Sequence, residues 1–122
     1  MIPVAVQEAA QAAGRHMLAE PVRIALDLSG DRGGLLVARA VYLAYTRDGK
    51  LHYVGKIDRA TGTARSRIGE HLRCSRRKRA AWRSLWVVPL DAQMSPSDVL
   101  SLERSLIRAH RPPGNVQHSR AA

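Results

Sequence analysis

The dipeptide Asp48-Gly49 constrains the fold of this chain more than any other stretch, because it lies between two runs rich in Val, Leu and Tyr. The first run covers residues 40–45 and the second covers residues 51–56. Asp and Gly both tolerate the positive φ of a type I′ turn, so the pattern predicts a β-hairpin with these two residues as its loop.

The register of that hairpin places particular side chains together. With a two-residue loop, Tyr42 lies directly opposite Gly55. Side chains alternate along a strand, so Tyr42 and Tyr53 share one face as diagonal neighbours roughly 7–8 Å apart. Gly55 has no side chain, so we expect unfilled space above its backbone beside the two phenols. Lys56 follows it in the chain.

The hairpin resembles the GIY-YIG nuclease family. The first family motif, Gly-Ile-Tyr, is matched by Ala40-Val41-Tyr42, and Ala40 stands where the family usually has Gly. The second motif, Tyr-Ile-Gly, is matched by Tyr53-Val54-Gly55. The family pattern begins near Leu36, so the N-terminal third of the chain lies outside the resemblance.

Later positions continue the resemblance in the family's order. An Arg on the first helix with a His one turn later, a Glu on a later helix and an Asn after a proline-rich corner are matched by Arg67, His71, Glu103 and Asn115. The resemblance implies a divalent-metal-dependent endonuclease that hydrolyses phosphodiester bonds in DNA. The implied cofactor is Mg²⁺ or Mn²⁺, for which a carboxylate oxygen is a suitable ligand.

The resemblance also implies a role for each of these residues. Glu103 would hold the metal, and Arg67 would stabilise negative charge on the phosphate. His71 would orient the nucleophile or contact a phosphate. Tyr42 would accept or relay a proton from water, which requires its phenol to be perturbed from a reference pKa near 10 by the metal, Arg67 or Lys56.

Tyr53 would position water or phosphate, whereas Asn115 would fix the loop after the last helix rather than take part directly. Each residue also has an ordinary structural interpretation. Glu103 can be a solvated helix carboxylate, Arg67 and His71 can be surface charges, and strands favour Tyr in any case. Tyr45 is expected on the opposite face of the strand from Tyr42.

The charge balance favours a polyanionic partner. Lys and Arg number 20 against 10 for Asp and Glu, a formal net charge of +10. An excess this large points to a polyanion such as nucleic acid. The resemblance makes double-stranded DNA the favoured partner. Besides Gly55 and Lys56, the residues expected to contact phosphate groups are Arg73, Arg76, Arg77, Lys78, Arg79 and Arg83. Trp86 is expected in the core, and the role of Trp82 stays open.

The remaining helices and strands are predicted from the periodicity of apolar residues and from residues typical of helix ends. Helices are predicted over residues 5–19, with Gly14 as a weak point, over 64–73, and from Pro96 to about His110. A short, very basic helical turn after Ser75 precedes a strand over 85–90. Residues 22–28 alternate as in a strand. We expect an α/β fold with a small central antiparallel sheet of three strands, or four with the N-terminal strand, flanked by helices.

We expect residues 1–35 to be an N-terminal extension packed on the domain, 36–117 to form the nuclease-like domain and 118–122 to be a frayed tail. One cysteine, Cys74, excludes an internal disulfide, and no zinc-ligand spacing occurs. No signal peptide or membrane span is evident. These features indicate a cytoplasmic protein.

Two rival functions stay open. The first is a catalytically inactive nucleic-acid-binding module of the same fold, and the second is a nuclease directed at RNA. Family members usually take specificity from an attached domain, and none is visible. A stand-alone enzyme, one that acts with a protein partner and one of weak specificity therefore stay open, as does the oligomeric state.

Overall fold

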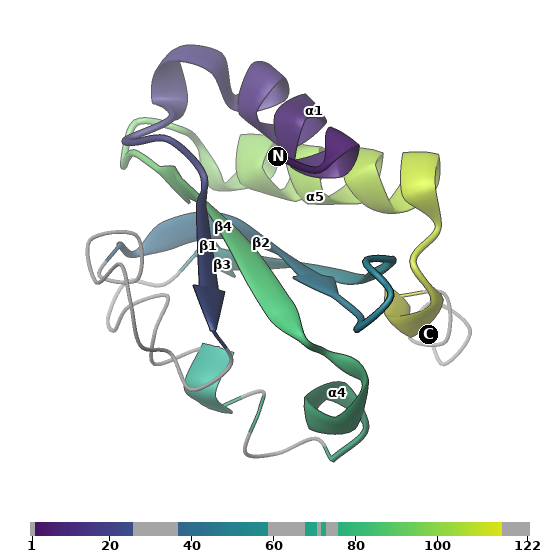
Figure 1. The fold of residues 1–122 in the computed structure, drawn as a ribbon. Helices are drawn as coiled ribbons and strands as arrows, with labels where there is room; N and C mark the ends of the chain where they lie inside the picture. Colours follow the sequence, from purple (N-terminus) through teal and green to yellow (C-terminus); the bar gives the residue numbers. More distant parts are fainter. Residues whose placement is uncertain (1, 26–36, 59–67, 71, 73–75, 116–122) are drawn as a thin grey trace.

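The sheet of this protein has four antiparallel strands in the order β1-β4-β2-β3. The computed structural model describes residues 2–25, 37–58, 68–70, 72 and 76–115 (Figure 1). The strands are β1 (Val22–Ala25), β2 (Arg39–Tyr45), β3 (Leu51–Asp58) and β4 (Ser84–Leu90). The predicted α/β class is confirmed, and the optional N-terminal strand is present because β1 pairs with β4.

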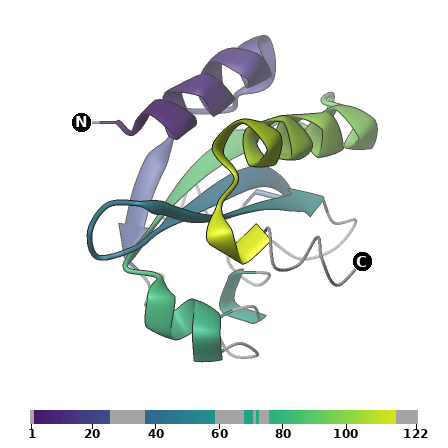
Figure 2. The same ribbon diagram turned by 90° about the vertical axis from the view of Figure 1, so that its right-hand side faces the viewer.

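Helices cover both faces of this sheet. They are α1 (Val4–Ala13), the short 3₁₀ helix η1 (Gly14–His16), α4 (Arg76–Ala81) and α5 (Pro96–His110). In both views α1 and α5 lie side by side over one face, while α4 lies beyond the other face (Figures 1 and 2). The chain therefore forms two cores, one on each side of the sheet.

The alternation of side chains along β2 divides its residues between these cores. Val41, Leu43 and Tyr45 pack with the buried residues of α1 and α5. Tyr42 and Ala44 pack on the opposite side, in a cluster that also contains buried residues from β1, β3, β4 and the 68–72 segment. The prediction that Tyr45 and Tyr42 face opposite ways is confirmed.

The N-terminal helix is shorter than expected. The periodicity predicted a helix over 5–19, but α1 ends at Ala13 and Gly14 takes φ +53. Glycine adopts this conformation without a steric penalty, so it ends the helix before the predicted stop at Pro21. Met17 then forms an isolated bridge with Leu90.

The hairpin loop also differs from the prediction. The N–H of Gly49 donates to the carbonyl of Thr46 (3.0 Å), and the N–H of Thr46 donates to the carbonyl of Lys50 (2.9 Å). The loop therefore has three residues, and only Gly49 has a positive φ, +77. A type I turn followed by a left-handed glycine explains this geometry without requiring a positive φ at Asp48.

The helix α5 begins and ends where its sequence predicts. The hydroxyl of Ser95 accepts from the N–H of Asp98 (3.1 Å), and Pro96 occupies the first turn. The helix ends at His110, and Arg111 adopts the left-handed conformation (φ 46). Its buried residues are Val99, Leu102 and Leu106, whereas Ala109, at similar helical spacing, is exposed.

Two other predicted helices are described only in part. Ile68–Glu70 and Leu72 are helical, and the rest of the predicted 64–73 helix lies outside the described residues. The basic turn after Ser75 is α4, as expected. Over the part of the chain that the structure describes, no helix has the length and apolar character needed to cross a membrane.

Candidate active site

Tyr42 lies directly over Gly55, the residue opposite it in β3. A Cβ atom added to Gly55 would lie 2.4 Å from Cζ and 2.5 Å from the hydroxyl oxygen of Tyr42. The expected pairing of Tyr42 with Gly55 is thus present. The expected unfilled space above Gly55 is absent, because the Tyr42 ring occupies it. Only 1% of the Tyr42 surface is exposed.

Tyr42, Tyr53 and Trp82 form a set of three packed rings, called the aromatic cluster below. The ring centroids of Tyr42 and Tyr53 are 6.1 Å apart, and Trp82 lies 6.3 Å from Tyr42 and 5.6 Å from Tyr53. These are favourable separations for offset or edge-to-face aromatic contacts. Trp82, whose role the sequence left open, is therefore a buried partner of both motif tyrosines.

A β-bulge adds His52 to the edge of the aromatic cluster. Ala44 pairs with Tyr53, but Tyr45 pairs with Leu51, so His52 is the extra residue of β3. The indole Nε1–H of Trp82 donates to Nδ1 of His52 (3.1 Å). Because an indole nitrogen can only donate, this bond requires a neutral imidazole with its proton on Nε2.

Sequence reasoning did not single out His52. Under the two-residue loop that the sequence predicted, His52 pairs with Tyr45 and faces away from Tyr42. The three-residue loop displaces that pairing by one residue, and the bulge compensates for it before Tyr53. No local sequence signal distinguishes the two loops, because Asp-Gly suits both.

Glu103 and Lys56 lie on the other side of the sheet from Tyr42. Helix α5, which carries the partly buried Glu103, packs on the face of Val41, and Lys56 pairs directly with Val41. Directly paired residues share a face, so the Lys56 side chain leaves β3 on the face opposite Tyr42, and its influence on the phenol stays a prediction. Since β3 is an edge strand, a site that uses both faces must extend around β3.

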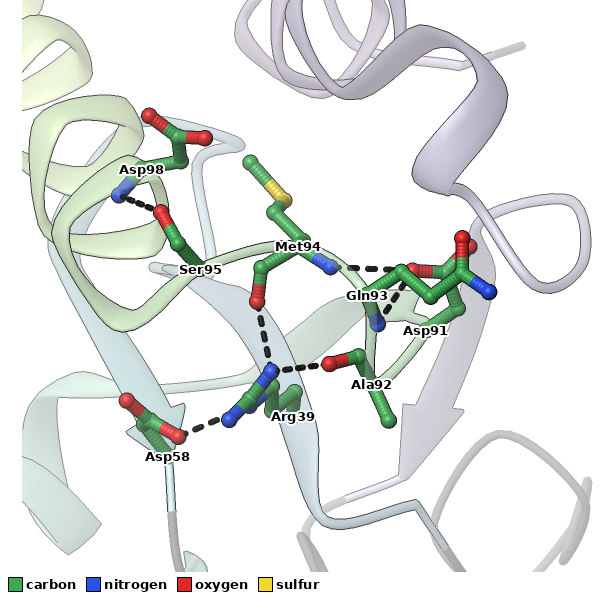
Figure 3. Close-up of polar contacts among 8 residues, drawn as sticks. All are labelled: Arg39, Asp58, Asp91, Ala92, Gln93, Met94, Ser95 and Asp98. Atoms are coloured by element: carbon green, nitrogen blue, oxygen red, sulfur yellow. Dashed lines mark hydrogen bonds and ion pairs between the residues drawn. The ribbon is translucent and has the colours of Figure 1, made fainter.

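Arg39 fixes the segment that leads into α5. Its Nη1 donates to the carbonyls of Ala92 and Met94, both at 2.5 Å, and its Nε pairs with the Asp58 carboxylate at 2.9 Å (Figure 3). These contacts join β2, the end of β3 and the loop before α5. Arg39 therefore ties the start of the hairpin to the loop that leads into the helix carrying Glu103.

The same loop is shaped by Asp91. Its carboxylate accepts from the N–H groups of Gln93 (3.0 Å) and Met94 (3.1 Å) and pairs with Nδ1 of His16 (3.1 Å). Burial alone would raise the pKa of Asp91, but the hydrogen bonds from His16, Met94 and Gln93 outweigh it and lower the pKa below its usual value.

Asn115 connects the corner after α5 to the edge of the sheet. Its Oδ1 accepts from the N–H of Val54 (2.7 Å), and its Nδ2 donates to the carbonyl of Val54 (2.9 Å). The side chain thus satisfies both backbone groups of one residue on an edge strand and is itself buried. Its proposed role in positioning the catalytic loop remains a prediction.

Ala40, the departure from the first family motif, is fully buried in the same core as Tyr42. Its Cα partners are Ile57 in β3 and Pro89 in β4. The additional methyl group is therefore part of the packing beside the aromatic cluster.

The remaining predicted site residues are placed only in part. Arg67, His71 and Arg73 lie outside the described residues, and so do the side chains of Arg77, Lys78 and Arg79. Arg76 in α4 and Arg83 before β4 are exposed. Ile68 and Leu72 belong to the core of Tyr42 and Trp82, so the helical segment that contains them packs on the same face as the aromatic cluster.

Glu103 suits a hard divalent cation as a single carboxylate ligand. Among the residues whose placement is described, no group of three or more His, Cys, Asp or Glu side chains could hold a metal ion. Magnesium commonly binds through one or two carboxylates together with substrate phosphates and water, so one carboxylate is compatible with it.

Comparison with known proteins returned no match, either to a protein-family model or to a curated protein. The family resemblance therefore depends on the order and spacing of the residues described above.

Proposed function

We propose that this protein is a divalent-metal-dependent endonuclease that hydrolyses phosphodiester bonds in DNA. The observation that carries the proposal is the pairing of the two tyrosine motifs, with the Tyr42 ring lying over Gly55 and Tyr53 beside it. A glycine is required there because any side chain would collide with Tyr42. The formal net charge of +10 supports a nucleic-acid substrate.

In this proposal the residues have separate tasks. Tyr53 is partly exposed and would hold the attacking water or a phosphate oxygen through its hydroxyl. Water would attack phosphorus as the bond between phosphorus and the leaving sugar oxygen breaks, and solvent would protonate that oxygen. Tyr42, as the phenolate, would receive the proton that the water loses, and Arg67 would stabilise the charge on the phosphate. A metal ion held by Glu103 would neutralise phosphate charge and activate water.

Two observations favour the inactive binding module as a second candidate. Tyr42 is 1% exposed, so its hydroxyl meets a substrate only after local rearrangement. Glu103 is carried by the helix on the opposite face of the sheet. A protein that keeps the fold and the charge but lacks catalysis would show both features.

Cleavage of supercoiled plasmid in Mg²⁺ or Mn²⁺ separates the two candidates. The nuclease predicts nicked or linear product that disappears in EDTA and falls by at least about 10²-fold in Glu103→Gln and Tyr42→Phe. Tyr45→Phe is the matched control, since it removes a hydroxyl from the same strand on the opposite face.

Intact plasmid with a gel shift that weakens as salt rises would instead establish the binding module. Parallel digestion of duplex RNA tests the RNA-directed alternative. Faster cleavage of RNA than of DNA would overturn the choice of substrate while leaving the reaction class in place.

A further inference from the structure

A cleft lies beside the start of β4, where β1 ends. It has a volume of about 310 Å³, and its described lining residues are Arg23, Ile24, Arg83 and Ser84. Arg23 comes from the N-terminal strand, which lies outside the family resemblance, whereas Arg83 follows α4. The cleft therefore joins the N-terminal extension to the basic part of the chain.

Both arginines of the cleft are exposed. Within the described part of the chain, neither the Arg23 nor the Arg83 side chain has a hydrogen bond or an ion pair. Arg39 provides the contrast, because its guanidinium group contacts two carbonyls and a carboxylate. Two guanidinium groups without acceptors beside a cleft form a site for an external anion.

The chemistry of the cleft favours a phosphodiester backbone. Each guanidinium presents a planar fork of donors that matches two phosphate oxygens. Four consecutive basic residues, 76–79, precede Arg83 closely in the chain and add to the positive charge of this part of the sequence. A polyanion with regularly spaced charges fits this arrangement.

The lining of the cleft argues against a membrane surface. Peripheral membrane binding uses exposed apolar side chains that insert among the lipids. The only large apolar residue of the described lining is Ile24, which is 2% exposed and packs in the core beside Tyr42.

We propose that Arg23 and Arg83 bind phosphate groups of a nucleic-acid backbone in this cleft, so that the N-terminal strand extends the nucleic-acid interface. The choice of nucleic acid as ligand rests on the proposed function, but the binding does not require catalysis.

The test is binding of a labelled DNA duplex in EDTA, which prevents metal-dependent cleavage. Affinity is measured by fluorescence anisotropy between about 50 and 200 mM salt for the full chain and for Arg23→Gln, Arg83→Gln and the double variant. Each single change should reduce the slope of log K against log salt by about 0.9, and the double change by about 1.8.

Arg108→Gln is the matched control, because it removes one exposed charge from α5 and lies outside the described lining of the cleft. Its slope should equal that of the unchanged chain. Arg23→Lys and Arg83→Lys should retain most of the slope, which separates charge from folding. Slopes for Arg23→Gln and Arg83→Gln equal to that of Arg108→Gln would overturn the proposal.

Duplex RNA, single-stranded DNA and polyglutamate serve as competitors. Displacement by either nucleic acid supports the backbone assignment, whereas equal displacement by polyglutamate would replace it with an acidic protein partner. Reduced slopes in a protein that cleaves no plasmid would leave this inference standing and refute the nuclease.

Discussion

At the scale of single residues, Gly55 and Tyr42 are complementary in shape. Gly55→Ala would place a methyl group 2.4 Å from Cζ of a buried ring, so Tyr42 must move within a packed core. We expect a loss of about 1–3 kcal/mol in the free energy of unfolding, measured by urea denaturation.

A double-mutant cycle identifies the cause of that loss. Leucine at position 42 lacks the two ring carbons and the hydroxyl oxygen that approach Gly55, so Tyr42→Leu should make Gly55→Ala much less costly. Gly49→Ala is the control, because it costs about 1–2 kcal/mol through its positive φ and meets no neighbour. If the losses of unfolding free energy for Tyr42→Leu and Gly55→Ala add in the double variant, the collision between the new methyl group and the Tyr42 ring is not the cause.

The bond from Trp82 to His52 is a second prediction at this scale. His52→Leu leaves a buried indole N–H without its acceptor and should cost about 1–3 kcal/mol in the free energy of unfolding. His52→Asn places an oxygen where Nδ1 lies and should cost less. Denaturation curves and the NMR chemical shift of the Trp82 indole proton measure the effect of both substitutions. Equal losses of unfolding free energy in His52→Leu and His52→Asn would show that the hydrogen bond to Nδ1 is unimportant.

At the scale of elements, Arg39 joins the hairpin to the start of α5. Arg39→Met retains much of the apolar stem but leaves the carbonyls of Ala92 and Met94 and the Asp58 carboxylate without their donor. We expect a loss of about 1.5–3 kcal/mol, measured by thermal or urea denaturation.

Arg23→Met is the matched control for this change, because Arg23 also lies on a strand but its side chain has no partner among the described residues. Its cost should stay within about 0.5 kcal/mol. If Arg39→Met also raises hydrogen exchange in the first turns of α5, the arginine positions the helix that carries Glu103. Unchanged hydrogen exchange in the first turns of α5 would show that Arg39 stabilises the sheet but does not position α5.

At the scale of the whole molecule, packing of α1 over β2 changes the ionisation of Tyr45. Burial, together with the carboxylate of Glu8 on α1, raises the pKa of Tyr45 from 10.0 to about 12. Since the folded pKa exceeds the unfolded one, the stabilisation from neutral Tyr45 is complete below pH 10 and is lost as pH rises toward about 12.

Tyr45→Phe should therefore reduce the fall in the free energy of unfolding between pH 10 and about 12, relative to the unchanged chain. Urea denaturation across this range measures the difference between the two proteins, which cancels the titration of other groups. Parallel curves for the two proteins would show that Tyr45 titrates normally in the folded state.

The positions of Tyr42 and of the helix that carries Glu103 are set by the arrangement of the whole molecule. Tyr42, Tyr53 and Ile68 lie on one face, while Glu103 lies on the helix that covers the other. A site that joins them must include the edge of β3, where Asn115 holds the Val54 backbone groups. The proposed catalysis therefore requires the hairpin, the 68–72 segment and α5 to act together.

Local patterns in the sequence determined the class of fold and most elements. Apolar runs indicated β2, β3 and β4, and alternation indicated β1. Ser95-Pro96 specified the start of α5, because such signals act through backbone geometry and nearest neighbours. The pairing of Tyr42 with Gly55 also followed from the hairpin, because strand period and turn position restrict the register.

Only the tertiary structure decided the geometry around the candidate site. Packing between segments distant in sequence determines three features: the three-residue loop, the bulge at His52, and the contact of Trp82 with both Tyr42 and Tyr53. The burial of Tyr42 depends on the same packing. Which face α5 would cover could not be read from its stripe, since an amphipathic helix can pack on either side of a sheet.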